Sequence, residues 1–234
     1  MKRFLITTAA VLAGSAAFAQ VSAGPEIGFA LNNYGYRIDG DKISTHMKPG
    51  IRVGGVVDIM LLRNLYLQPG LMYNNRGYLY KEVYDRSTAF SRITVTDRAN
   101  ETAHFLEMPI NLLYKSGSPK SPARFMIGGG PYFAATLAGR YKSSTTTRIS
   151  NEAGTTETTS RIDDRLYVGN DSRSDDLRPF DVGMNFNMGV QFYSGLYLRG
   201  NVGIGFANML PGGDANNYIH NWGTAFSVGY LFGR

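Results

Sequence analysis

The sequence predicts an all-β fold: an eight-stranded antiparallel up-and-down transmembrane β-barrel. Three observations support this prediction. Large apolar residues recur at every second position in eight separate segments, which is the period of a strand with one apolar face. The connections between these segments alternate between long and short. Lysine and arginine are absent from the apolar face of the segments, as a face in contact with lipid requires.

The first four predicted strands lie near 21–33, 50–61, 65–80 and 103–115. Gly, Pro, Asn and Ser bound these runs, which is typical of strands. Their apolar faces consist of Ile27, Phe29 and Leu31, then Ile51, Val53, Val57 and Ile59, then Leu65, Leu67, Pro69, Leu71 and Tyr73, then Leu106, Met108, Ile110, Leu112 and Tyr114.

The last four predicted strands lie near 124–141, 179–193, 196–207 and 221–232. Residues 186–206, FNMGVQFYSGLYLRGNVGIGF, show the pattern in two of them, with a tight turn at 193–195. Aromatic residues near the strand ends on the apolar face predict the girdles of a membrane barrel. These residues are Tyr73, Tyr114, Tyr141, Trp222 and Tyr230.

The connections predict which end of the barrel carries the loops. Four long polar loops are expected near 34–48, 81–102, 142–178 and 208–220, and short turns at 62–64, 115–123 and 193–195. In an up-and-down barrel this alternation places every long loop at the outer end and every short turn at the periplasmic end. We expect 142–178, which is rich in Ser, Thr, Asp and Arg, to be a mobile solvated loop.

The N-terminus has the pattern of a secretory signal peptide. Lys2 and Arg3 precede an apolar run, and Ala17-Phe18-Ala19 provides small residues before Gln20. We therefore expect residues 1–19 to be removed on export and the barrel domain to comprise residues 20–234. No later window is apolar and long enough for a transmembrane helix.

A soluble eight-stranded barrel with an apolar interior is the alternative. A strand that faces water normally carries Lys and Glu, whereas the six lysines after the leader lie in loops or at strand ends. The alternate positions are mostly Gly, Ala, Asn, Gln and Ser. Small polar residues suit the narrow interior of an eight-stranded barrel, so the pattern favours the membrane barrel.

Seven charged residues fall on the inward face by strand parity. They are Glu26, Arg52, Asp58, Arg76, Glu107, Asp181 and Arg199. Ions in a narrow interior must be paired and hydrogen-bonded, so we expect a structural charge network that fills the lumen. Within it, Arg199 is expected to pair with Asp181 or Glu107. An ion pathway is the functional alternative, which the small diameter of such a barrel disfavours.

Three motifs carry a resemblance to a known family. They are LQPGLMY at 67–73, FLEMPINLLYK at 105–115 and GGGPY at 128–132, and the last strand, SVGYLF at 227–232, resembles a barrel-assembly signal. Together they resemble the outer-membrane β-barrel family common in Bacteroidota, often described as porin-family or PorT-like. The resemblance covers essentially the whole chain after residue 19. It implies an outer-membrane location and contact with the assembly machinery, and it implies no transported substrate.

The sequence offers little catalytic chemistry. Cysteine is absent, which excludes thiolate metal sites. The glycines at 200, 203 and 205 lie inside a predicted strand, so they do not form a phosphate-binding loop. The three histidines, His46, His104 and His220, are expected at the outer rim or in outer loops, where no serine–base pair is evident. The acidic residues between 163 and 176 do not have the spacing of a calcium loop.

The function expected from these observations is that of a non-enzymatic outer-membrane protein with a filled lumen and surface loops for structural or interaction roles. A small passive porin and a lipid-modifying enzyme are the alternatives. We expect a monomer without cofactor or metal, in contact with outer-membrane lipid and, during biogenesis, with the barrel-assembly machinery. No basic run with interleaved aromatic residues indicates a nucleic-acid partner, and the sequence does not identify an extracellular partner.

Overall fold

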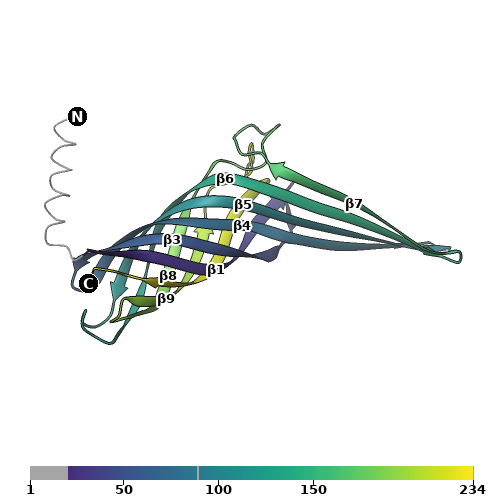
Figure 1. Cartoon of the computed structure of the whole chain (residues 1–234). Helices are drawn as coiled ribbons and strands as arrows, with labels where there is room; N and C mark the ends of the chain where they lie inside the picture. Colours follow the sequence, from purple (N-terminus) through teal and green to yellow (C-terminus); the bar gives the residue numbers. More distant parts are fainter. Residues whose placement is uncertain (1–20, 89, 234) are drawn as a thin grey trace.

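The computed structural model describes residues 21–88 and 90–233, and the expected signal peptide at 1–19 lies outside them. The described chain forms ten strands (Figure 1). They are β1 (Val21–Ile38), β2 (Asp41–Ile43), β3 (His46–Leu62), β4 (Leu65–Ser87), β5 (Ser91–Lys115), β6 (Ala123–Asn151), β7 (Gly154–Leu166), β8 (Phe180–Phe192), β9 (Leu196–Gly205) and β10 (Tyr218–Tyr230). Within these residues there is no helix long and apolar enough to cross a membrane.

Eight of the strands close into a ring. The antiparallel order is β10-β9-β8-β6-β5-β4-β3-β1, and β1 also pairs with β10. The closing register is long, running from Glu26 opposite Gly229 to Arg37 opposite Tyr218. β2 and β7 extend the sheet beyond the ring by pairing with β1 and β6. The prediction of an eight-stranded up-and-down barrel is therefore confirmed.

The two ends of the barrel differ. The turns after β3, β5 and β8 lie at one end, the short-turn end, where both ends of the described chain also meet through the bridge between Ala23 and Phe232 (Figure 1). All the long connections lie at the other end, the long-loop end. This is the arrangement that the alternation of short and long connections predicts.

The outer surface of the ring is an apolar band, because alternate side chains point outward. Ile27 is 64 % exposed and Phe226 is 69 % exposed, whereas their neighbours Glu26 and Ala225 are buried. A bulge changes this alternation in one strand. His104 pairs with Ala138 and Phe105 with Thr136, so Leu137 is an extra residue on β6. Beyond it the parity of β6 reverses, and Tyr141, expected in the outer aromatic girdle, instead packs against the interior.

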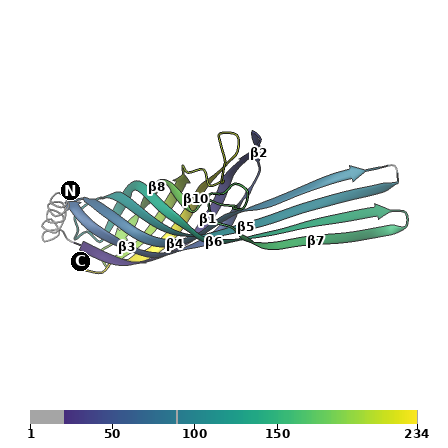
Figure 2. The same ribbon diagram turned by 90° about the horizontal axis from the view of Figure 1, so that it is seen from above.

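The segments expected as loops at 81–102 and 142–178 differ most from the sequence prediction. β4, β5, β6 and β7 continue far beyond the ring as a four-stranded antiparallel sheet (Figure 2). We call this extension, residues 79–87, 91–102, 140–151 and 154–165, the hairpin sheet. It is rich in Thr, Val, Ile and Tyr, which favour strands. Polar residues occur on both of its faces, so the alternation that marks a half-buried strand is missing.

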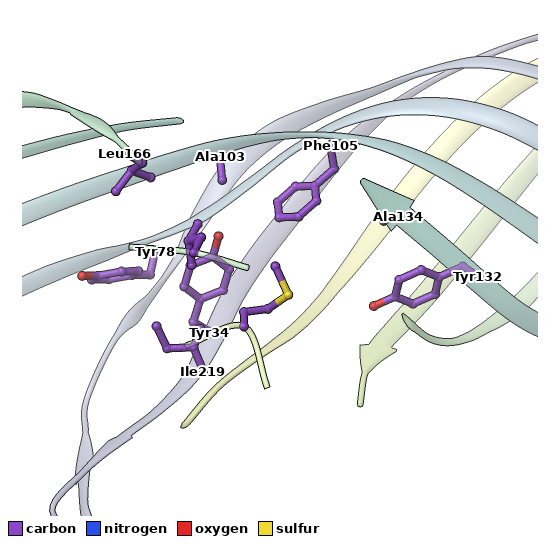
Figure 3. Packing of buried hydrophobic residues seen from close by; sticks show 10 residues of the cluster. Tyr34, Tyr78, Ala103, Phe105, Tyr132, Ala134, Leu166 and Ile219 are labelled. Carbon is purple, nitrogen blue, oxygen red and sulfur yellow. The ribbon is translucent and has the colours of Figure 1, made fainter. Parts of the chain in front are cut away.

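Buried apolar residues close the long-loop end of the barrel. Figure 3 shows this cluster, which we call the outer cap. It consists of Tyr34, Tyr78, Ala103, Phe105, Tyr132, Ala134, Leu166, Leu177, Met209 and Ile219. Leu177 and Met209 come from the connections before β8 and β10, and both side chains are almost completely buried. These two connections therefore fold over the mouth of the barrel.

Candidate functional site

The interior of the barrel is built around Arg52 of β3, which connects two neighbouring regions of the lumen. Its Nη1 donates to Glu26 Oε1 over 2.7 Å and its Nη2 donates to Glu107 Oε1 over 3.1 Å. Arg52 is 2 % exposed and each carboxylate is 1 % exposed. A buried guanidinium is tolerated when it is paired in this way, and its planar fork suits two carboxylates at once.

Arg76 of β4 continues the network toward the long-loop end. It donates to Glu107 and, over 3.0 Å, to Asp181 Oδ2. Asp181 also accepts hydrogen bonds from the Tyr132 hydroxyl and the Asn221 amide, each over 2.9 Å. The guanidinium lies 5.2 Å from the Phe105 ring centroid and 5.0 Å from that of Tyr132. Because Phe105 and Tyr132 belong to the outer cap, ion pairs and apolar cap form one continuous packing unit.

Arg199 of β9 carries the network toward the short-turn end. It donates to Glu26 and to the side-chain oxygen of Gln68. Gln68 donates in turn to Asp58 over 3.1 Å, and Asp58 accepts from Lys115. The chain of contacts therefore runs through the barrel from Lys115 to Asp181.

The structure buries all seven residues that parity placed inside and joins them in this single network. The expected partners of Arg199 are wrong. Gly189 of β8 pairs with Arg199 of β9, so Asp181 lies about eight residues farther along the barrel than Arg199, roughly 26 Å along the strand. Glu26 instead lies two strands away at a similar height. Strand register decides this pairing, and side-chain parity alone does not give register.

Lys115 is the network member that sequence reasoning missed. The sequence predicts an exposed strand-end position for Lys115, yet it is fully buried and contacts Asp58 and the ring of Tyr66. A signal was present, because Lys115 follows the outward-facing Tyr114 and so has inward parity. With it, four cationic side chains face four carboxylates in the network.

The lumen has little free volume at its centre. The cavity between Arg52, Arg76 and Asn221 measures ≈ 20 Å³, enough for about one water molecule. A larger hollow of ≈ 590 Å³ opens at the short-turn end, where Asp58, Tyr66 and Arg124 form part of its lining. The barrel is thus open to solvent at one end and filled in its middle, with the outer cap above.

Glu101 is a buried acid of the hairpin sheet, beyond the apolar band, and lies opposite Tyr78 of the outer cap and Tyr141 of β6. Its Oε1 atom makes no hydrogen bond within the described part of the chain. The pKa of its carboxyl is raised to about 8, mainly by burial and further by the nearby Asp176, while Lys48 opposes the rise. Asp176 precedes Leu177 of the outer cap, so the protonation of Glu101 is coupled to the connection that carries Leu177.

The histidines make local contacts. His104 Nδ1 lies 2.6 Å from the Tyr73 hydroxyl, with the two rings stacked. His220 Nδ1 lies 3.1 Å from the carbonyl oxygen of Ala207, and His46 is exposed at the start of β3. Within residues 21–88 and 90–233, no group of three His, Cys, Asp or Glu side chains is placed to hold a metal ion.

The ring, its apolar outer band and its charged interior define a membrane-type β-barrel. Residues 16–211 match the family described as outer membrane protein beta-barrel domain. The chain belongs to this family, and it is an outer-membrane β-barrel protein. In outer-membrane barrels with this layout the short turns are periplasmic and the long loops lie outside.

Among solved structures, the chain is similar to other outer-membrane proteins at low identity. The attachment invasion locus protein Ail of Yersinia pestis, in complex with the heparin analogue sucrose octasulfate, has 10 % identity and a TM-score of 0.35, with 91 % of this chain and 99 % of Ail covered. Neisserial surface protein A has 10 % identity and a TM-score of 0.34, with 91 % and 97 % covered. The N-terminal barrel domain of Pseudomonas aeruginosa OprF has 13 % identity and a TM-score of 0.29, with 92 % and 99 % covered. No curated protein matches the sequence.

Proposed function

We propose that this protein is a closed, non-enzymatic outer-membrane barrel whose role is structural or adhesive. The observation that carries the proposal is the filled lumen. A continuous series of buried ion pairs and hydrogen bonds crosses it, only ≈ 20 Å³ remains free at its centre, and apolar residues cover its outer mouth. The surfaces outside the membrane are then the hairpin sheet and the cap connections, and these are available to bind an extracellular partner.

The proposal includes the route to the membrane and the state of the protein there. Residues 1–19 serve as the export signal, and the terminal strand is read by the barrel-assembly machinery. The barrel functions as a monomer, since β1 and β10 pair with each other and leave no edge in the ring. The motifs at 67–73 and 105–115 support a place in the porin-family, PorT-like branch common in Bacteroidota.

Solute uptake by proteoliposomes tests whether the barrel is closed. Vesicles containing the refolded protein should swell no faster in small sugars and amino acids than protein-free vesicles. A double variant, Arg76→Ala with Glu107→Ala, removes adjacent bulky side chains from the centre of the network and should raise the rate. Swelling of wild-type vesicles that falls with solute size would instead establish the passive porin.

Lipid analysis tests the absence of enzymatic activity. A deletion strain complemented with wild-type protein or with His104→Ala should have the same lipid profile as the uncomplemented deletion strain. Because His104 contacts the Tyr73 hydroxyl, it is the histidine best placed for acid–base chemistry at the rim. A lipid species restored by wild-type protein and lost with His104→Ala would establish a lipid-modifying enzyme.

A further inference from the structure

Three basic residues form a row across the outward face of the hairpin sheet. Lys81 of β4 lies directly opposite Arg98 of β5. Arg98 lies opposite Ser144 of β6, and Ser144 lies opposite Arg161 of β7. The three bases therefore share one row and one face of the four-stranded sheet. Like charges directly opposite each other destabilise a sheet, so this row has a cost in the isolated protein.

Three other bases on the same face, unlike these, are each held by an acid. Arg92 pairs with Asp85, Arg140 with Asp163, and Arg148 with Glu157. Within the described residues, none of Lys81, Arg98 and Arg161 forms an ion pair. The nearby acids Glu82 and Asp97 have the opposite parity, and Asp97 accepts a hydrogen bond from Thr145 on the other face. A compact set of cations is thus left without anions.

A surface groove of ≈ 540 Å³ runs beside this row. Its lining includes Arg98, Lys142, Arg161 and the partly exposed Leu79, and Asp163 is the only acid in the lining. Asp163 is already held by Arg140 and Lys142. The groove therefore presents several cationic side chains around a small apolar contact, a combination suited to an anion attached to an apolar body.

The row faces the same way as the lipid-contacting surface. β5 is continuous from Ser91 to Lys115, so Arg98 has the parity of the exposed Leu106 and Met108. On β6, the outward-facing positions beyond the apolar band are, in order, Arg140, Lys142 and Ser144, and Ser144 is the position that belongs to the row. Four residues of strand span about 13 Å, and the tilt of barrel strands reduces the height further. Long basic side chains extend toward interfacial anions, so the row lies within reach of outer-leaflet headgroups.

We infer that Lys81, Arg98 and Arg161 form a binding site for the phosphate groups of an outer-leaflet glycolipid. Arginine favours phosphate because its planar fork donates two parallel hydrogen bonds. The bound phosphates relieve the repulsion between Lys81 and Arg98, and the acyl chains of the same lipid lie against the apolar band below. The site anchors the hairpin sheet to the membrane surface and fixes its direction.

Native mass spectrometry of the refolded protein in neutral detergent tests this inference, with bis-phosphorylated lipid A as the titrant. The triple variant Lys81→Gln, Arg98→Gln, Arg161→Gln should bind about 100-fold more weakly, because each basic residue near an anionic lipid surface contributes about 1 kcal/mol. The matched control Arg86→Gln, Arg92→Gln, Arg148→Gln removes the same charge from the same sheet, nearer its tip. It should bind within about twofold of wild type, because these side chains lie farther from the membrane surface than the row.

Three results would overturn the inference. One is equal weakening in the test and control variants, which would mean a general charge effect. The second is undiminished binding of dephosphorylated lipid A, which would exclude phosphate recognition. The third is displacement of lipid A by millimolar inorganic phosphate, which would assign the site to a free anion. Each variant must first show the heat-modifiable gel migration of the folded barrel, so that loss of binding is not loss of fold.

Discussion

Arg52 is the residue on which the interior depends most directly, because it satisfies carboxylates on two other strands. Glu26 and Glu107 each gain a second cation, from Arg199 and Arg76 respectively. Each carboxylate is therefore shared between two guanidinium groups, and each guanidinium serves two acceptors. Such networks are more than the sum of separate pairs, and removal of one member leaves its partners buried and undercompensated.

We expect Arg52→Gln to destabilise the folded barrel by about 3–5 kcal/mol, the usual cost of breaking a buried pair. Urea unfolding in lipid vesicles, followed by Trp222 fluorescence, measures the change. Arg92→Gln is the control, since its pair with Asp85 is exposed and such pairs contribute about 0–1 kcal/mol. Equal midpoints for Arg52→Gln and wild type would show that the network does not support the fold.

Glu101 makes the outer cap sensitive to pH. Its pKa is about 8 in the folded protein against 4.5 for the free side chain, so the folded state favours the protonated acid. The associated stability is complete below pH 4.5 and is lost as pH rises through about 8. We expect the connection at 167–179 to resist protease at pH 6 and to be cut faster at pH 9. Glu101→Gln should remove most of this dependence, and an unchanged pH profile in that variant would contradict the assignment.

At the scale of elements, the hairpin sheet is an addition to the barrel. Its strands pair with one another beyond the ring, whereas the cap residues Leu166, Leu177 and Met209 lie at its base. The two faces of the sheet are solvated, so its stability comes from strand pairing and β-branched residues more than from burial. The barrel should therefore fold when the distal part of this sheet is removed.

Replacement of residues 145–160 by Asn-Gly tests this independence. The change joins Ser144 to Arg161, which are paired neighbours, through a two-residue hairpin turn. We expect the shortened protein to keep its heat-modifiable migration and the urea midpoint of the barrel. A chain that no longer folds would show that the distal part of the β6–β7 hairpin is needed to form the barrel.

The sequence predicts the ring better than it predicts what lies above it. Alternation is imposed wherever one face meets lipid and the other meets the lumen, so the eight strands and the seven inward charges follow from parity. The hairpin sheet has two polar faces and gives no such signal, so the sequence alone predicts loops there. Parity alone puts Tyr141 on the wrong face, because the bulge at Leu137 leaves no mark in the alternation.

Ion-pair partners were the least predictable feature of the interior. Parity shows that Arg199 points inward, but its partner depends on the relative heights of β9, β8 and β1. Those heights follow from the shear of the closed barrel, a property of the whole ring. Lys115 was missed for a different reason, since lysines at strand ends are usually exposed and its inward parity was outweighed by that expectation.

At the scale of the whole molecule, the account describes an outer-membrane barrel with a solid interior that carries a sheet on its outer side. The lumen stays closed only if both the charge network and the outer cap are intact. Single-channel recording in planar lipid bilayers tests this most directly. The account predicts that the inserted wild-type protein gives no stable conductance steps at moderate voltage. Reproducible ohmic steps from protein whose insertion is verified would contradict it and show that ions pass through the network.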